Sequence, residues 1–202
     1  MDTPPVATDQ KKARDLQAPL IFSDESGLLL APLIRTTQSP RGRTPLLIHR
    51  ASHRQKVSAA AALSLSPIRG HIQLHYQTLV NAYFNSERYA LFLRELLHDM
   101  RGPLVLVHDN ANLHRGEPMR DLCHEFPRLH LHNLPPYAPE LNPVESLWNW
   151  CKDKQLVNFA PHDIEELWAG AKLCLEDVQH DQDRLRSFLE STPLSWKGTG
   201  LI

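Results

Sequence analysis

The chain contains 202 residues, of which 42% are hydrophobic, and its formal net charge at pH 7 is −1. This length suits one domain with a small appendage, and the sequence has no run of about 18 apolar residues that could cross a membrane. The N-terminus lacks the apolar stretch of a signal peptide, and three scattered cysteines without a Cys-x-x-Cys pair argue against a disulfide framework or a zinc site, so we expect a cytoplasmic protein with reduced thiols.

Strands are expected in the first half of the chain. Residues 1–17 are polar, charged and proline-containing, which predicts a disordered tail or linker. The apolar segment 19–30 predicts a strand with Asp24 at its end or at a turn, and residues 36–45, rich in Thr, Ser, Pro, Arg and Gly, predict a loop. Further strands are expected over 45–48, 57–65 and 71–77.

Helices and strands are expected to alternate in the second half. An apolar stripe predicts a helix from Ser86 to about Met100, and the continuous apolar run 104–107 predicts a buried strand of the parallel type. The remaining elements are a helix over 117–126, a strand near 129–133, and helices that start at Asn142, Asp163 and about Gln182. This order indicates an α/β fold of the ribonuclease-H-like type, in which helices flank a mixed sheet. We expect this domain to span 18–160, with the helices of 161–202 packed on it or following it.

A proline-rich segment, 134–141, leads into the helix that carries Glu145. Asn142 is a good N-cap residue, and Pro143 suits the first helical position. Glu145 has the position of a capping-box partner, where it also complements the helix dipole. A role of Glu145 in a functional site requires further carboxylates to converge on it.

Two more carboxylates belong to strands. Asp24 lies in or just after the first strand, and Asp109 directly follows the buried strand 104–108. Ligands gather at the carboxyl ends of parallel strands, so neighbouring strands would bring Asp24 and Asp109 together and let Glu145 close the site. Three converging carboxylates repel one another unless a cation neutralises them. All-oxygen ligands suit Mg²⁺ or Mn²⁺, and two such ions can promote phosphodiester chemistry.

The segment between Ser26 and Ser86 is basic. It contains seven Lys or Arg residues and no Asp or Glu, whereas the chain from Glu87 onward has 12 Lys or Arg against 18 Asp or Glu. A surface that binds a polyanion needs such an excess of positive charge. We expect the stretch 35–56 of this segment, with Arg41 and Arg43, to hold the backbone of DNA; the alternative is a solvated basic face without a special role.

Three segments that contain the carboxylates resemble the signature blocks of DDE transposases, and they are most similar to those of the mariner superfamily and its bacterial insertion-sequence relatives. These segments are 21–27 (Ile-Phe-Ser-Asp-Glu-Ser-Gly), 108–114 (His-Asp-Asn-Ala-Asn-Leu-His) and 134–145 (Leu-Pro-Pro-Tyr-Ala-Pro-Glu-Leu-Asn-Pro-Val-Glu). The 35 residues between Asp109 and Glu145 are close to the superfamily's spacing, and residues 40–45 resemble its loop after the first strand. The resemblance covers about 20–150.

The resemblance implies that Asp24, Asp109 and Glu145 are the catalytic triad and bind two Mg²⁺ or Mn²⁺ ions. It further implies cleavage of double-stranded DNA at element ends and joining of 3′-hydroxyl ends to target DNA, by a homodimer in the bacterial cytoplasm at the nucleoid. Family members normally carry N-terminal helix-turn-helix domains, so we expect another reading frame to supply such a half. Two alternatives remain open: a nuclease of the same fold without strand transfer, and a catalytically silent DNA-binding remnant of a transposase.

Residues near the triad have competing interpretations. With the resemblance, Asn110 is expected to orient a carboxylate or phosphate, and His114 to contact the DNA backbone or the scissile phosphate; the alternative is a turn-capping Asn and an exposed His. Tyr137 is expected to pack its loop rather than stack on a base, and Trp148 to pack in the core. Glu25 is excluded as a fourth ligand, because adjacent side chains of a strand point to opposite faces.

Overall fold

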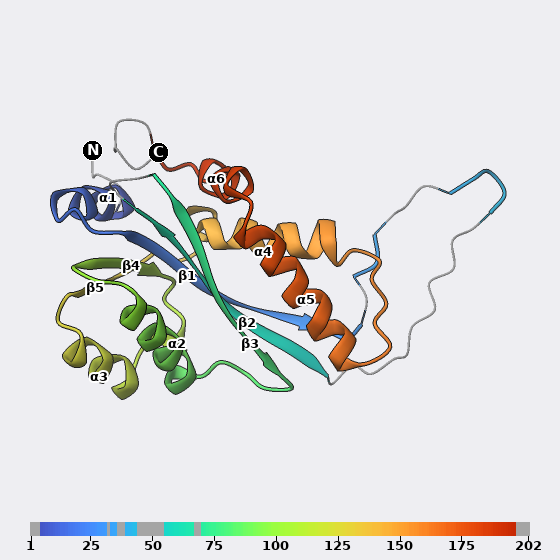
Figure 1. Ribbon diagram of the computed structural model, residues 1–202, viewed down its shortest axis with the longest axis horizontal. Helices are drawn as coiled ribbons and strands as arrows, with labels where there is room; N and C mark the ends of the chain where they lie inside the picture. Colours follow the sequence, from blue (N-terminus) through green and yellow to red (C-terminus); the bar gives the residue numbers. More distant parts are fainter. Residues whose placement is uncertain (1–4, 32, 36–38, 44–54, 67–69, 197–202) are drawn as a thin grey trace.

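The computed structural model describes residues 5–31, 33–35, 39–43, 55–66 and 70–196, and its centre is a five-stranded mixed sheet (Figure 1). The strand order is β3-β2-β1-β4-β5. β1 and β3 run antiparallel to β2 between them, whereas β4 runs parallel to β1 and β5 parallel to β4. The strands are β1 (Leu20–Leu29), β2 (Lys56–Leu65), β3 (Ile72–Val80), β4 (Leu104–His108) and β5 (Leu129–Asn133).

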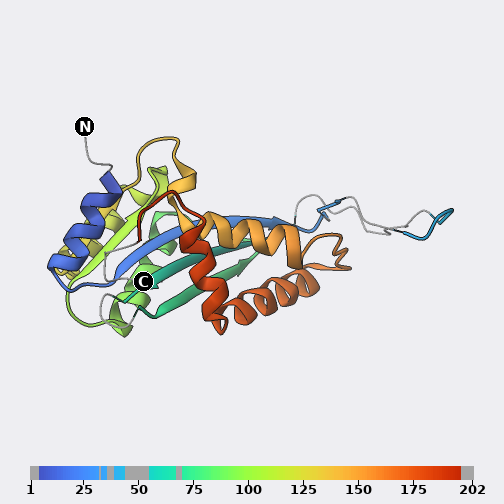
Figure 2. The ribbon, with the colours of Figure 1, turned by 90° about the horizontal axis from the view of Figure 1, so that it is seen from above.

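Helices cover both faces of this sheet (Figures 1 and 2). On one face lie α2 (Ser86–Asp99) and α3 (Glu117–Glu125). On the other lie α4 (Pro143–Trp150), α5 (Ile164–Gln179) and α6 (Gln182–Glu190). Short helical turns follow β4, β5 and α4 at Asn112–His114 (3₁₀), Pro139–Leu141 (3₁₀) and Cys151–Gln155 (π).

The alternation of side chains along the central strands explains the two helical layers. Leu20 and Phe22 of β1 belong to the buried cluster beneath α4, α5 and α6, whereas Ile21 between them belongs to the cluster beneath α2 and α3. The alanine run of β2, 59–62, divides between the clusters in the same way. Because the central strands are buried on both faces, their sequences are continuous runs of apolar or small residues.

The predicted architecture, a mixed sheet flanked by helices, is confirmed. The predicted strand 45–48 lies outside the described residues. None of the helices in the described part of the chain is long and apolar enough to cross a membrane.

Residues 5–15 form a helix, so the prediction of a disordered tail over 1–17 is wrong for the described part of that segment. Helix α1 (Pro5–Asp15) packs against β1 and β4, and the side chains of Val6 and Ala13 are fully buried. The polar composition of this segment misled the prediction, because the buried stripe of the helix includes Asp9 and Gln10 as well as Val6 and Ala13.

Val6→Asp tests the docking of α1. A carboxylate at this fully buried position has to leave the core or ionise at a cost, so we expect a loss of about 2–3 kcal/mol, which is roughly a 5–10 °C fall in Tm. Thr8→Asp, on the exposed side of the same helix, is the matched control and should leave Tm nearly unchanged. Equal Tm values for both variants would show that the helix does not dock in solution.

Candidate active site

Two carboxylates meet where β1 and β4 lie side by side. Residues 20–22 of β1 pair in parallel with 105–107 of β4. Two residues further along, the same register brings Asp24 level with Asp109, which directly follows β4. Asp24 lies within β1 and not at its end, because β1 continues to Leu29 through its pairing with β2.

Helix α4 supplies the third carboxylate, Glu145. Asn142 caps this helix, since its Oδ1 accepts a hydrogen bond of 3.2 Å from the Val144 amide, and its Nδ2 donates to the Ser23 carbonyl at 3.2 Å. The cap therefore joins α4 to β1. The backbone amide of Asn142 donates to the Pro139 carbonyl, so it is not the capping-box partner of Glu145.

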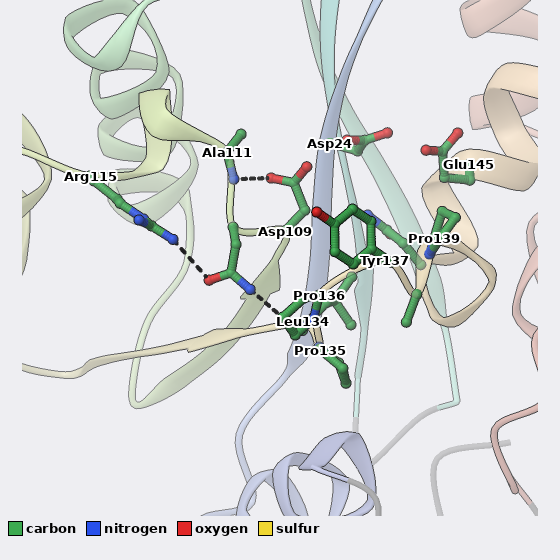
Figure 3. Close-up of a pocket in the computed structure, with 13 residues that line it drawn as sticks. Asp24, Asp109, Ala111, Arg115, Leu134, Pro135, Pro136, Tyr137, Pro139 and Glu145 are labelled. Atoms are coloured by element: carbon green, nitrogen blue, oxygen red, sulfur yellow. Dashed lines mark hydrogen bonds between the residues drawn. The ribbon is translucent and has the colours of Figure 1, made fainter.

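The structure brings all three predicted carboxylates into one open pocket of about 560 Å³ (Figure 3). In Figure 3, the Asp24 and Glu145 carboxylates point toward one another. The rest of the wall comes from the segment after β4 and from the proline-rich loop. These lining residues are Asn110, Ala111, Arg115, Leu134, Pro135, Pro136, Tyr137, Ala138, Pro139 and Asn142.

The carboxyl group of Asp24 is buried among other negative charges. Burial, followed by the negative charges of Glu145, Glu25 and Asp109, raises the pKa of Asp24 to about 8. The Trp148 indole Nε1 donates a hydrogen bond of 3.0 Å to its Oδ2. Trp148 does pack in the core, as predicted, but it has this second role, which its spacing of three residues from Glu145 on one helical face could have indicated.

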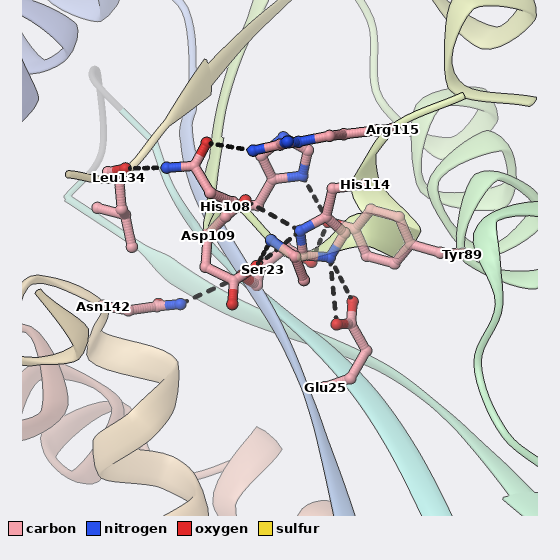
Figure 4. Close-up of polar contacts among 11 residues, drawn as sticks. Ser23, Glu25, Tyr89, His108, Asp109, His114, Arg115, Leu134 and Asn142 are labelled. Atoms are coloured by element: carbon pink, nitrogen blue, oxygen red, sulfur yellow. Dashed lines mark hydrogen bonds and ion pairs between the residues drawn. The ribbon is translucent and has the colours of Figure 1, made fainter. Parts of the chain in front are cut away.

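Asp109 is held by a buried histidine (Figure 4). His114 Nδ1 lies 2.8 Å from Asp109 Oδ1, and its Nε2 lies 3.1 Å from both carboxylate oxygens of Glu25. Burial opposes the charged imidazole, but the hydrogen bonds to Asp109 and Glu25 outweigh it and raise the pKa of His114 to about 10. The hydrogen bond from His114 in turn holds the pKa of Asp109 below its usual value, against the effect of burial.

His114 is therefore neither the exposed residue of one interpretation nor a side chain that lines the pocket. Its ring stacks on His108 at 4.3 Å between centroids. Burial and the neighbouring His114 lower the pKa of His108 to about 3, so this second ring is neutral. The Tyr89 hydroxyl lies 3.0 Å from Ser23 Oγ and 3.2 Å from His108 Nδ1 and completes a polar layer behind the carboxylates.

Asn110 supports the wall of the pocket. Its Nδ2 donates to the Leu134 carbonyl at 2.7 Å, and its Oδ1 accepts from Arg115 at 3.4 Å, so it ties the proline-rich loop to the end of β4. Arg41 and Arg43 are exposed and lie on a projecting segment well away from the pocket (Figure 1). The structure therefore does not bring these two arginines to the carboxylates.

The chemistry of the pocket suits a hard divalent cation. The donors are carboxylate oxygens, and a cation would offset the burial and the neighbouring negative charges that together raise the pKa of Asp24. Among the described residues, no three or more His, Cys, Asp or Glu side chains are arranged for ligation as they stand. Hydrogen bonds from Trp148 and His114 orient one oxygen of Asp24 and one of Asp109, so the set fits a cation in its chemistry.

The raised pKa of Asp24 predicts a pH-dependent gain in stability for Asp24→Asn. Between pH 3.8 and about 8, Asp24 is ionised in the unfolded chain but protonated in the folded one, so wild-type stability falls as pH rises through this range and stays low above it. Without divalent cations, the variant should exceed the wild-type Tm by about 5 °C or more at pH 8.5, with the gap closing near pH 4. Glu140→Gln, an exposed acid nearby, should show no such trend, and a pH-independent gap for Asp24→Asn would contradict the assignment.

Comparison with solved structures supports the fold assignment. The chain is similar to the crystal structure of the Mos1 mariner paired-end complex with Mn, with a TM-score of 0.66 and 16% identity over 93% of this chain and 56% of that one. It is also similar to the Mos1 paired-end complex with Mg, with a TM-score of 0.58 and 17% identity over 91% of this chain and 58% of that one. A pre-cleavage Mos1 transpososome matches with a TM-score of 0.56 and 15% identity over 96% of this chain and 62% of that one. The chain thus spans little more than half the length of these proteins. At such identities the likeness shows the fold, which confirms the ribonuclease-H-like prediction.

A search of curated proteins finds no match to the chain. A family model described as DDE superfamily endonuclease matches residues 19–168, which include all three carboxylates, and the predicted resemblance to DDE enzymes is thereby confirmed. The chain belongs to the DDE superfamily endonuclease family.

Proposed function

We propose that this chain is the catalytic part of a DNA transposase, which cleaves DNA at element ends and joins the 3′-hydroxyl ends to target DNA. The observation that carries the proposal is the convergence of Asp24, Asp109 and Glu145 on one open pocket, where their mutual repulsion calls for cations. Mos1 complexes with paired ends and after strand transfer have the same fold and support DNA as the substrate.

The three carboxylates are proposed as ligands of two Mg²⁺ or Mn²⁺ ions. When bound, such ions activate a water or hydroxyl and stabilise charge on the leaving oxygen of a phosphodiester. The protein's part is to position the carboxylates: Trp148 and His114 orient Asp24 and Asp109 from outside the pocket, and the Asn142 cap fixes the start of α4 on β1.

The DNA backbone is proposed to lie along basic side chains outside this pocket. Arg115 is in the pocket wall, and Arg41 and Arg43 would contact DNA at a distance from the carboxylates, on the projecting segment. Such contacts are sequence-independent and weaken with salt. A homodimer and a helix-turn-helix half from another frame remain part of the proposal, by likeness to the mariner superfamily.

Loss of any one triad carboxylate should abolish metal-dependent nicking of supercoiled DNA, since two carboxylates cannot place the ions. The variants are Asp24→Ala, Asp109→Ala and Glu145→Ala. Glu140→Ala is the control, because it removes an exposed acid from the proline-rich loop beside the pocket. Nicking that persists in one variant would remove that residue from the triad.

A second measurement separates the alternatives. Joining of a labelled 3′-end to a plasmid is expected of a transposase and is absent from a nuclease, whereas a silent remnant need not bind Mn²⁺ at the carboxylates at all.

His114→Ala should raise the Mn²⁺ concentration for half-maximal nicking by about 10–100-fold, because it releases Asp109 and leaves Glu25 without its partner. His114→Asn keeps a donor near the position of Nδ1 and should recover part of this loss. His124→Ala, at an exposed histidine, is the control. An unchanged metal requirement in His114→Ala, with nicking intact, would show that Asp109 needs no support from this ring.

A further inference from the structure

Tyr137 has a combination of features that packing does not explain. Its side chain is 101% exposed, so the expectation that it packs its loop is wrong. Its backbone φ is 59°, in the left-handed region that bulky residues avoid and that glycine or asparagine favours. Residues 136–137 form a turn, and in a type II turn the residue directly after the proline needs this conformation.

The loop is fixed on both sides of this tyrosine. On one side, the Leu134 amide donates to the His108 carbonyl at 2.7 Å, and the Leu134 carbonyl accepts from Asn110 at 2.7 Å. On the other side, the 3₁₀ turn Pro139–Leu141 leads directly into the buried Asn142 cap. The strained conformation therefore persists because its flanks are held, a pattern that occurs at binding and catalytic sites.

The Tyr137 ring lies at the carboxylate pocket. Tyr137 lines the same pocket as Asp24, Asp109, Glu145 and Arg115, and Figure 3 shows its ring over the pocket between Asp109 and Pro139. A pocket of about 560 Å³ is in the range that accommodates a small organic ligand such as a nucleotide. A phosphate held at the carboxylates would thus have a nucleobase within reach of this ring.

We propose that Tyr137 stacks on a nucleobase that has left its duplex stack, next to the phosphate in the carboxylate pocket. Each base inside a continuous duplex is covered on both faces by its neighbours, so an exposed aromatic ring can stack only on a base at a strand end or on a displaced nucleotide. The rigid loop lowers the entropy lost when the ring is immobilised. This inference rests on the proposed function, because it assumes DNA in the pocket.

Tyr83 is the natural comparison within the chain. It is also exposed, at 70%, but the Lys56 ammonium lies over its ring, and it does not line the carboxylate pocket. Tyr83→Asn is therefore a matched control that removes an exposed tyrosine without changing the pocket.

The test measures binding of the 202-residue chain to three fluorescent DNAs in Ca²⁺, by anisotropy. One is a short blunt duplex, the second carries a few unpaired nucleotides at a 3′ end, and the third carries the same extension with abasic sugars. We expect the extension with bases to bind about ten-fold more tightly than the abasic one. Tyr137→Asn should lose this difference, whereas Tyr137→Phe and Tyr83→Asn should keep it.

Thermal unfolding provides the readout that separates stacking from a structural role. Asparagine tolerates the left-handed conformation, so Tyr137→Asn should match or exceed the wild-type Tm, by up to roughly 4 °C. A fall in Tm would show that Tyr137 supports the loop and would overturn the inference. A base-dependent preference that survives in Tyr137→Asn would also overturn the inference, but the proposed function would stand as long as the duplex is still bound. Failure of the wild-type chain to bind any of the DNAs would overturn both the inference and the proposed function.

Discussion

The burial of Asp24 beside the negative charges of Glu145, Glu25 and Asp109 is the constraint on which the arrangement of this protein depends. Carboxylates packed side by side away from water resist ionisation, and the pKa of about 8 for Asp24 expresses that resistance. Hydrogen-bond donors outside the pocket, Trp148 and His114, offset part of the repulsion. Among the residues that the structure describes, no side-chain cation in the pocket forms an ion pair with Asp24 or Glu145. The ionised form of Asp24 therefore lowers the stability of the folded chain, and such destabilisation is common at functional sites.

The supporting donors come from opposite faces of the sheet. Trp148 approaches Asp24 from α4, whereas His114 approaches Asp109 from the side of α2, with the His108 ring stacked on it and the Tyr89 ring tilted against it. The strand alternation that separates Asp24 from Glu25 is what makes this possible, since one carboxylate lines the pocket while its neighbour holds the imidazole. Adjacent acids in the sequence therefore have different roles.

Much of the fold and the three carboxylates could be predicted from the sequence, because periodicity, caps and spacing are local signals. The contacts that support the carboxylates are harder to predict, because Trp148 donates to a residue 124 positions away, and His114, five residues after Asp109, also contacts Glu25, 89 positions away. Asp24 was misplaced at a strand end because β1 extends beyond β4 along β2, which no local pattern reveals. Helix α1 was missed because its interior-facing side includes a polar residue, Asp9, whose partner His132 lies 2.8 Å away on β5.

Helix α4 makes two of the three carboxylates mechanically dependent on each other. It bears Glu145 and also the indole that holds Asp24, and its N-cap residue, Asn142, donates a hydrogen bond to β1. A small rotation or translation of this one helix would alter both carboxylates at once, whereas Asp109, directly after β4, has no such link to α4. The positions of Asp24 and Glu145 are therefore coupled through α4, so a partner that binds the outer surface of this helix would change the shape of the pocket without entering it.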